Sequence, residues 1–249
     1  MSIELDFIKD MFDSIAPKYD FLNRFLSAGQ DILWRKEMVS DSQIPNNSSV
    51  LDVACGTCDV SLEIKKQKGN TVKIFATDFS PNMLALGKDK IIKKRDGIMK
   101  KNETNISEKN MIDLVAGNAL FLPFKDAFFD AVFIAFGIRN IMDKQGAIKS
   151  FYKVLKNGGT LAVLELTSPP EGLFRDIYLL YFKRLLPTIG TLFSKNSNAY
   201  HYLPNSVLNF PTPEKFATIL LDSGFEMVNW KRMTLGIVTL FIAKKKPAL

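Results

Sequence analysis

Residues 50–59 join an apolar run to an acid and a turn of small residues, and no other stretch constrains the fold as strongly. Val50, Leu51 and Val53 have the apolar, partly β-branched character of a buried parallel strand. After Asp59 the apolar residues recur at helical spacing. A strand, a tight turn and a helix in this order place the turn at the carboxyl edge of a sheet, where open α/β folds bind their ligands.

Three kinds of site compete for this turn. A dinucleotide-binding loop needs Gly-x-Gly-x-x-Gly, and it is disfavoured because Cys58 and Ser61 occupy the second and third glycine positions. Cys55 and Cys58 form a C-x-x-C pair, which beside a βαβ pattern also occurs in thioredoxin-like redox proteins. The third kind of site holds a nucleoside without a phosphate nest. S-adenosylmethionine, a sulfonium cation beside a ribose, fits this third description.

An acid follows the turn at a spacing that has a physical meaning. Asp78 comes about twenty residues after Gly56, at the end of a second expected strand, residues 71–77. Such an acid lies at the tip of the neighbouring strand, where its carboxylate can accept both ribose hydroxyls. A second role, as the cap of the helix that begins near Pro81, is compatible with the first.

Several motifs resemble those of class I methyltransferases. Residues 51–57, Leu-Asp-Val-Ala-Cys-Gly-Thr, resemble their first motif, residues 77–80 the acidic end of their second strand, and residues 117–124 their adenine loop. The resemblance implies S-adenosylmethionine as the cofactor, with a binding site formed by Asp52, Gly56, Thr57, Asp78, Asn118 and Ala119. Cys58 stands where many of these enzymes have glycine, and Asn118 where many have aspartate. An amide can still donate and accept at an adenine edge.

A rarer motif narrows the resemblance. Residues 136–140, Phe-Gly-Ile-Arg-Asn, resemble the ubiquinone/menaquinone biosynthesis C-methyltransferases, as do the opening of the chain and residues 200–211. The resemblance implies methyl transfer to a ring carbon of a polyprenylated hydroquinone, a lipophilic quinol, with demethylmenaquinol preferred over the ubiquinone precursor. In that family the Arg and Asn of this motif and an early Tyr surround a base-acting water. These roles correspond to Arg139, Asn140 and Tyr19 here.

Arg139 offers the chemistry that carbon methylation needs. Methyl transfer to carbon is an in-line displacement, which requires near-attack contact and an electron-rich ring. Loss of the phenolic proton next to the reacting carbon enriches the ring, and the Arg139 guanidinium can stabilise the phenolate. Arginine stays protonated, so a polarised water is a more suitable base than arginine itself. In an alternative role, Arg139 pairs with an acid such as Asp143 and only holds the loop.

The order of the remaining elements predicts the fold. Expected strands alternate with helices and are followed by two strands joined by a short turn; the later strands are residues 111–116, 126–135, 160–166, 225–233 and 237–243. This order predicts an α/β fold with a seven-stranded, mainly parallel sheet and an antiparallel edge hairpin. Such a sheet resembles the Rossmann-like fold of class I methyltransferases. We interpret residues 88–110 as a helix tail followed by a solvated loop, because few apolar residues occur there.

The chain is expected to form one domain. Its 249 residues are enough to bury a sizeable core, and no linker divides them. We interpret residues 1–43 as an N-terminal helical cap and residues 171–210 as a substrate lid. Whether the protein is a monomer or a homodimer stays open at this point.

Charge and apolar patterning bear on the partners. The formal charge of +7 admits nucleic acid or an anionic membrane surface. The basic cluster at residues 93–101 has no interleaved aromatic residue, so we expect no nucleic-acid partner, with an RNA methyltransferase as an alternative. Residues 172–193 are rich in large apolar side chains, and with the lysines at positions 244–246 they predict peripheral contact with an anionic membrane surface.

The remaining expectations concern location and metals. The sequence shows no secretory leader, no bilayer-spanning apolar stretch and only two cysteines, which predicts a cytoplasmic protein. Cys55, Cys58 and His201 are too few soft ligands for a structural zinc site, so no metal is expected. A non-catalytic S-adenosylmethionine binder and a thiol redox module are further alternatives.

Overall fold

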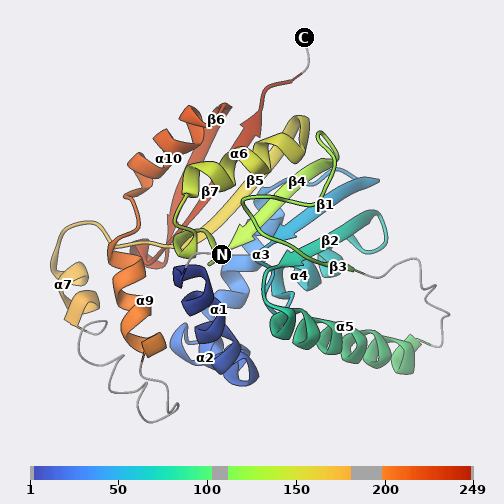
Figure 1. Cartoon of the computed structure of the whole chain (residues 1–249), viewed down its shortest axis with the longest axis horizontal. Helices are drawn as coiled ribbons and strands as arrows, with labels where there is room; N and C mark the ends of the chain where they lie inside the picture. The colour runs from blue at the N-terminus through green and yellow to red at the C-terminus, as the bar shows by residue number, and fades with distance from the viewer. Residues whose placement is uncertain (1–2, 103–111, 181–197, 248–249) are drawn as a thin grey trace.

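The computed structural model describes the backbone of residues 3–102, 112–180 and 198–247, and it shows a seven-stranded sheet flanked by helices (Figure 1). The strands are β1 (Ser48–Val53), β2 (Val72–Asp78), β3 (Asp113–Ala116), β4 (Phe129–Ala135), β5 (Leu155–Leu166), β6 (Phe225–Met233) and β7 (Val238–Lys245). Their order is β3-β2-β1-β4-β5-β7-β6. The first five are parallel, and β7 runs antiparallel to both β5 and β6. The predicted α/β sheet with an antiparallel edge hairpin is therefore confirmed.

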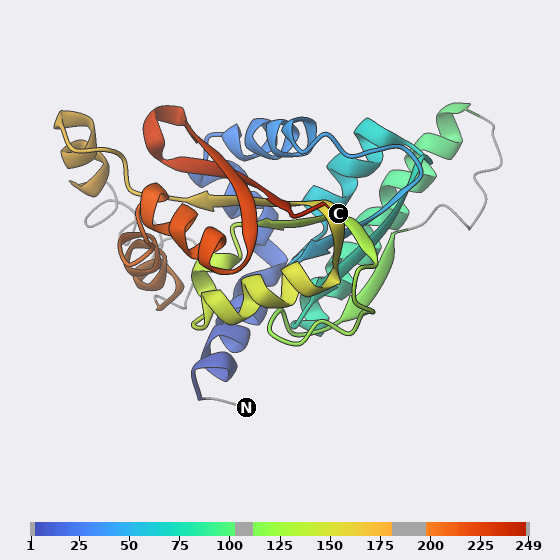
Figure 2. The same cartoon turned by 90° about the horizontal axis from the view of Figure 1, so that it is seen from above.

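Helices cover both faces of this sheet (Figure 2). One face carries α3 (Gln30–Asp41), α4 (Asp59–Lys68) and α5 (Pro81–Asn102), and the other carries α6 (Lys144–Val154) and α10 (Pro213–Asp222). Alternate residues of β1 serve the two faces, because successive side chains of a strand point to opposite sides. Val50 packs in the core that includes Met38, whereas Leu51 packs in the core that includes Phe151. All four side chains are fully buried.

The strand order reverses between β1 and β4, and this reversal creates the ligand crevice of the fold. Helices gather at the same end of the sheet: α1 (Ile3–Ile15), a short 3-10 helix (Ala16–Lys18), α2 (Tyr19–Leu26), α7 (Leu173–Leu180) and α9 (Asn198–Leu208) (Figure 1). Pro17 lies in the short helix, where the sequence predicts a break between two helices. The cap and lid assignments stay predictions, and residues 181–197 of the expected lid lie outside the described residues.

Two expected boundaries differ from the structure. The helix α5 continues to Asn102 through the basic cluster, because lysine and arginine are good helix formers; the expected helix tail is thus longer, and residues 103–111 lie outside the described part. The strand β5 begins at Leu155, earlier than the predicted start at residue 160. Leu155 pairs with Phe129 ahead of a register shift, so the strand contains an irregularity before Thr160.

Candidate active site

The loop after β1 turns sharply through left-handed backbone. Ala54, Gly56 and Cys58 have φ values of 51°, 51° and 66°. The neighbouring strand holds this loop, since the Cys55 amide donates to the Thr77 carbonyl at 3.0 Å. Each of the two non-glycine residues in the left-handed conformation stores about 1–2 kcal/mol of strain, which the surrounding contacts must offset.

Asp78 connects β2 to this loop. Its carboxylate is 6% exposed, and it accepts the Gly56 amide at 2.8 Å and the Ser80 amide at 2.9 Å, one on each oxygen. Burial has the largest effect on the carboxyl and raises its pKa above the ordinary value, although the backbone donors oppose this. Because each carboxylate oxygen can accept a further hydrogen bond, Asp78 can bind a ligand while it holds the turn.

A cavity of about 210 Å³ lies beside Asp78. We call it the cofactor cavity; its lining includes Gly56, Asp78, Phe79, Met83, Asn118, Ala119 and Leu120. Four of the six predicted cofactor residues are among them. The Asn118 side chain accepts the Leu120 amide at 2.9 Å, which fixes the turn after β3.

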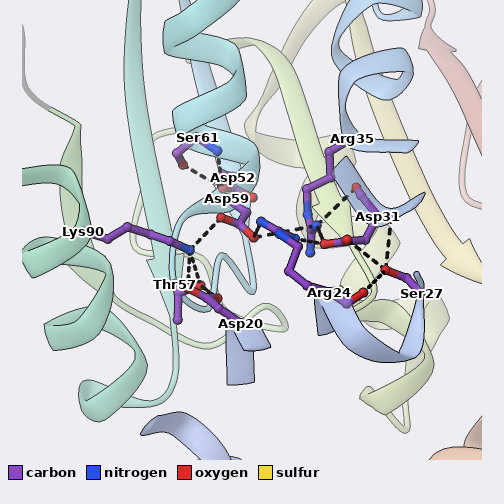
Figure 3. A network of polar contacts seen from close by, with 10 residues as sticks. All are labelled: Asp20, Arg24, Ser27, Asp31, Arg35, Asp52, Thr57, Asp59, Ser61 and Lys90. Atoms are coloured by element: carbon purple, nitrogen blue, oxygen red, sulfur yellow. Dashed lines mark hydrogen bonds and ion pairs between the residues drawn. The ribbon is translucent and has the colours of Figure 1, made fainter. Parts of the chain in front are cut away.

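The two other predicted cofactor residues lie beside this cavity without lining it. Asp52 is buried below the loop, where one carboxylate oxygen accepts the Ser61 amide at 3.0 Å and the Ser61 hydroxyl at 2.7 Å. Burial raises the pKa of Asp52 to about 7. The Thr57 hydroxyl donates to Asp20 at 2.6 Å and accepts from Lys90 at 3.0 Å (Figure 3). Both side chains therefore hold the loop through protein contacts.

The C-x-x-C pair is packed beneath the loop. The two Sγ atoms are 3.9 Å apart, and Cys58 lies against Gly87 of α5, where an added Cβ would come within 2.7 Å of its Sγ. The contact with Cys58 and burial raise the pKa of the Cys55 thiol well above its ordinary value. Because the thiolate is the reactive form, these positions disfavour redox chemistry. The described residues contain no cluster of side chains arranged to bind a metal.

A second, larger cavity of about 450 Å³ lies next to the first. We call it the apolar cavity; its lining includes Met11, Phe12, Ile15, Tyr19, Leu22, Leu26, Trp34, Phe136, Arg139, Leu166, Ile177 and Tyr202. Phe12, Tyr19 and Phe136 line both cavities and so form a common wall. Phe136 itself has a left-handed φ of 58°, a strained conformation that is frequent at functional sites.

Arg139 lies in a 3-10 helix (Ile138–Asn140) directly after β4. Its Nη1 donates to Glu165 Oε1 at 2.6 Å and to the Phe136 carbonyl at 2.5 Å. The side chain is 9% exposed, and its Nε has no hydrogen-bond partner among the described residues. A buried N–H of a guanidinium that lines an apolar cavity is a position at which a ligand oxygen can bind.

The partner of Arg139 is Glu165 rather than Asp143. Glu165 ends the buried part of β5, is fully buried, and also accepts the Leu166 amide at 2.8 Å. Asp143 instead caps α6 by accepting the Gly146 amide at 2.7 Å, so Asp143 is the wrong example of a partner, whereas pairing of Arg139 with an acid is observed. The sequence alone missed Glu165, although an acid near the end of an otherwise apolar strand was a usable signal.

The predicted catalytic residues meet around the common wall. Tyr19 lines both cavities, Arg139 the apolar cavity and Asn140 the cofactor cavity. The Asn140 amide oxygen accepts the Tyr202 hydroxyl at 3.1 Å, which connects α9 to this group. The structure thus brings Tyr19, from the start of the chain, close to the consecutive residues Arg139 and Asn140; the catalytic roles of all three stay predictions.

Comparisons with known proteins agree with this geometry. The family model described as the ubiE/COQ5 methyltransferase family matches residues 1–245. The chain is 42% identical over 238 residues to the ubiquinone/menaquinone biosynthesis C-methyltransferase UbiE of Geotalea daltonii, which covers 96% of each protein. It is 40% identical over 239 residues to the demethylmenaquinone methyltransferase of Deinococcus radiodurans, covering 96% of this chain and 92% of that protein.

Solved structures show the same fold at low sequence identity. A putative S-adenosyl-L-methionine-dependent methyltransferase from Methanococcus maripaludis matches with a TM-score of 0.65 and 16% identity, over 96% of this chain and 95% of that one. A similar match, with a TM-score of 0.64 and 17% identity, is an S-adenosylmethionine-dependent methyltransferase from Thermotoga maritima, covering 96% of this chain and 99% of that chain.

Proposed function

Because the chain belongs to the ubiE/COQ5 methyltransferase family, we propose that this S-adenosylmethionine-dependent C-methyltransferase acts on a ring carbon of a polyprenylated hydroquinone, with demethylmenaquinol as its substrate. The observation that carries the proposal is the pair of adjoining cavities. One is lined by the acid and amide expected at a nucleoside, and the other is mostly apolar and is lined by Arg139, whose buried Nε has no hydrogen-bond partner among the described residues. The common wall brings the two ligands next to each other.

The residues of the cofactor cavity fit S-adenosylmethionine. The Asp78 carboxylate has acceptor capacity beyond its two backbone bonds, which suits the two ribose hydroxyls. Asn118 provides a side-chain amide for the base, and Ala119 and Leu120 provide apolar surface beside it. Phe79 and Met83 add apolar surface near the edges of the sugar and the base. When bound, S-adenosylmethionine supplies an electrophilic methyl group.

Arg139 is suited to stabilise the charge that develops on the quinol oxygen. Glu165 and the Phe136 carbonyl hold one end of the guanidinium, which leaves the Nε–H for the ring oxygen. A preorganised donor in a dry site stabilises such charge far better than water does. Tyr19 and Asn140 border the same wall, where they can orient a water that takes the phenolic proton.

The direct test is turnover with matched substrates. We expect formation of S-adenosylhomocysteine with a short-tail demethylmenaquinol, because the apolar cavity and Arg139 suit a hydroquinone ring. A short-tail benzoquinol precursor and bulk RNA serve as the comparisons, measured by product formation at equal concentration. Preference for the benzoquinol would favour the ubiquinone pathway, turnover of RNA would favour the RNA methyltransferase, and cofactor binding without product would contradict the enzyme assignment.

The membrane proposal needs a correction in one part. Among the described residues, no helix is long and apolar enough to cross a bilayer. The Lys245 ammonium donates to the carbonyl of Leu155 at 2.8 Å, at the start of β5, whereas Val238 pairs with Leu166 at its end, near the apolar cavity. Lys245 therefore lies at the end of the sheet away from the apolar cavity, so the lysines at positions 244–246 give no support to membrane contact through α7.

We propose instead that the enzyme meets an anionic membrane through α2 and α7. A polyprenyl substrate dissolves in the bilayer, and the helices beside the apolar cavity expose large apolar side chains: Phe21 and Phe25 are 55% and 50% exposed, and Leu173 is 77% exposed. Ile177 is both exposed and part of the cavity lining, so apolar surface continues from the outside into the cavity. This continuity supports entry of the substrate from the lipid phase.

Leu173→Ser should weaken binding to anionic vesicles by about tenfold, since burying a leucine side chain contributes about 1.5 kcal/mol or more. Met227→Ser is the matched control, because Met227 is 60% exposed on β6 at the other end of the sheet. Vesicle flotation at low and high salt gives the measurement, with salt expected to weaken binding. No flotation of the unchanged protein at low salt, or an equal loss for both variants, would contradict this surface.

A further inference from the structure

Asp59 lies at the centre of a partly buried ionic network that connects four helices (Figure 3). It is the first residue of α4, directly after the left-handed Cys58, and its side chain is 13% exposed. One carboxylate oxygen accepts Arg24 of α2 at 2.9 Å, and the other accepts Lys90 of α5 at 2.6 Å. Arg35 of α3 lies 3.7 Å away. Burial raises the pKa of Asp59, but these three cations outweigh it and hold the pKa below its ordinary value.

One arm of the network reaches the apolar cavity. Arg24 and Arg35 both pair with Asp31, and the Arg35–Asp31 distance is 2.5 Å. Asp31 and Arg35 line the apolar cavity and are almost completely buried. The guanidinium of Arg35 also lies over the ring of Phe136, 5.3 Å from its centre. The contacts of Asp59 therefore extend to the common wall.

The other arm reaches the cofactor loop. Lys90 pairs with Asp20 at 2.6 Å, and Asp20 accepts the Thr57 hydroxyl at 2.6 Å. Thr57 follows Gly56, which lines the cofactor cavity, and Asp20 follows Tyr19, which lines both cavities. The position of α2 is thus set on one side by the cofactor loop and on the other by the wall of the apolar cavity.

The network is balanced in charge and depends on Asp59 for that balance. The acids Asp20, Asp31 and Asp59 face the bases Arg24, Arg35 and Lys90, three against three. Removal of the central carboxylate leaves no ionic contact between the two arms, which then connect only through the backbone of α2, to which Asp20 and Arg24 both belong. Because the members of the network share the Asp59 carboxylate, a change in one arm alters the contacts available to the other arm.

We propose that Asp59 is a positioning residue that couples the two cavities: it holds α2, and with it Tyr19, so that occupation of the cofactor cavity favours binding of the quinol. The inference rests on the proposed function for the identity of the second ligand. A bound cofactor fixes the loop of Gly56 and Thr57, and through Asp20 and Asp59 it fixes the wall that the quinol meets. Couplings of this kind are typically about 5- to 150-fold in affinity.

The coupling can be measured by binding alone. Trp34 lines the apolar cavity, and Trp230→Phe removes the only other tryptophan, so quenching by 1,4-naphthoquinone reports on that cavity. We expect saturating S-adenosylhomocysteine to raise the naphthoquinone affinity about fivefold or more, and Asp59→Asn to bring this ratio close to one. In turnover assays the same variant should raise the quinol KM by a similar factor and change kcat less.

Controls separate coupling from a loss of stability. Asp130→Asn is the matched variant, because Asp130 pairs with Lys156 at 2.8 Å and accepts the Ser49 amide at 2.8 Å away from both cavities. It should lower the melting temperature and leave the ratio unchanged. Lys90→Gln removes one arm and should lower the ratio of naphthoquinone affinities even if Asp59→Asn does not fold.

A ratio of one in the unchanged protein, or an unaltered ratio in folded Asp59→Asn or Lys90→Gln, would overturn the inference. The absence of quinol turnover in the unchanged protein would instead contradict the proposed function.

Discussion

Arg139→Met is expected to lower kcat by about 10² or more, while the affinity for S-adenosylmethionine changes by less than about threefold. Methionine keeps a long side chain but removes the Nε–H that has no partner among the described residues. If this group stabilises charge that develops on the quinol oxygen, its loss affects the transition state more than the ground state. Turnover with a short-tail demethylmenaquinol and calorimetry with the cofactor measure the two quantities.

Glu165 requires a control for this experiment. Arg139→Met leaves the fully buried carboxylate of Glu165 without its cation, which costs about 3–5 kcal/mol of stability. The double variant Arg139→Met with Glu165→Gln removes both charges and retains one acceptor oxygen, although the backbone amides of Arg139 and Leu166 bond to different oxygens of the carboxylate. It should recover part of the lost melting temperature without recovering turnover. Recovery of both would show that Arg139 only holds the loop.

Asp78→Ala is expected to raise the cofactor Kd by about 10²-fold or more, because each hydrogen bond to a charged carboxylate contributes about 1.5–3 kcal/mol. The carboxylate also holds the amides of Gly56 and Ser80, so some loss of stability accompanies the loss of affinity. Calorimetry gives the affinity, and thermal unfolding gives the stability.

Ser80→Ala is the matched control for Asp78. The Ser80 hydroxyl accepts the Met83 amide at 3.1 Å and donates to Asp13 at 2.5 Å, so this variant loosens the same turn and leaves the carboxylate in place. It should cost about 1 kcal/mol of stability, as the loss of a helix cap does, with little change in affinity. Equal losses of affinity in both variants would mean that loop order, rather than contact with the ribose, explains the effect of Asp78.

The sequence predicted the fold and Asp78 because both follow from local patterns. Parallel strands end at one edge of a sheet, so an acid at the end of the second strand must lie near the turn after the first. Asp52 and Thr57 belong to the same motif, yet their side chains bind Ser61 and Asp20 instead of lining the cofactor cavity. A motif states which residues are adjacent in the chain, but only packing decides which way each one faces.

Glu165 and Asp59 show where local patterns give no information. Glu165 pairs with Arg139, 26 positions away in the sequence, and Asp59 pairs with Arg24, 35 positions away. Each pair forms because a buried charge needs a counter-charge. The sequence alone cannot say which of several acids supplies that counter-charge, because the choice depends on the folded structure. The sequence therefore indicated Arg139 and an acidic partner for it, but the example it offered was Asp143 rather than Glu165.

Cys58 and Gly87 constrain how this family member can vary over evolutionary time. The Cys58 thiol occupies the space that a side chain at position 87 would need, since a Cβ there would lie 2.7 Å from its Sγ. Glycine at position 58 would relieve the left-handed backbone and leave a gap that alanine at position 87 could fill. The two positions are therefore expected to change together among relatives: cysteine opposite glycine in one lineage, and glycine opposite a larger residue in another.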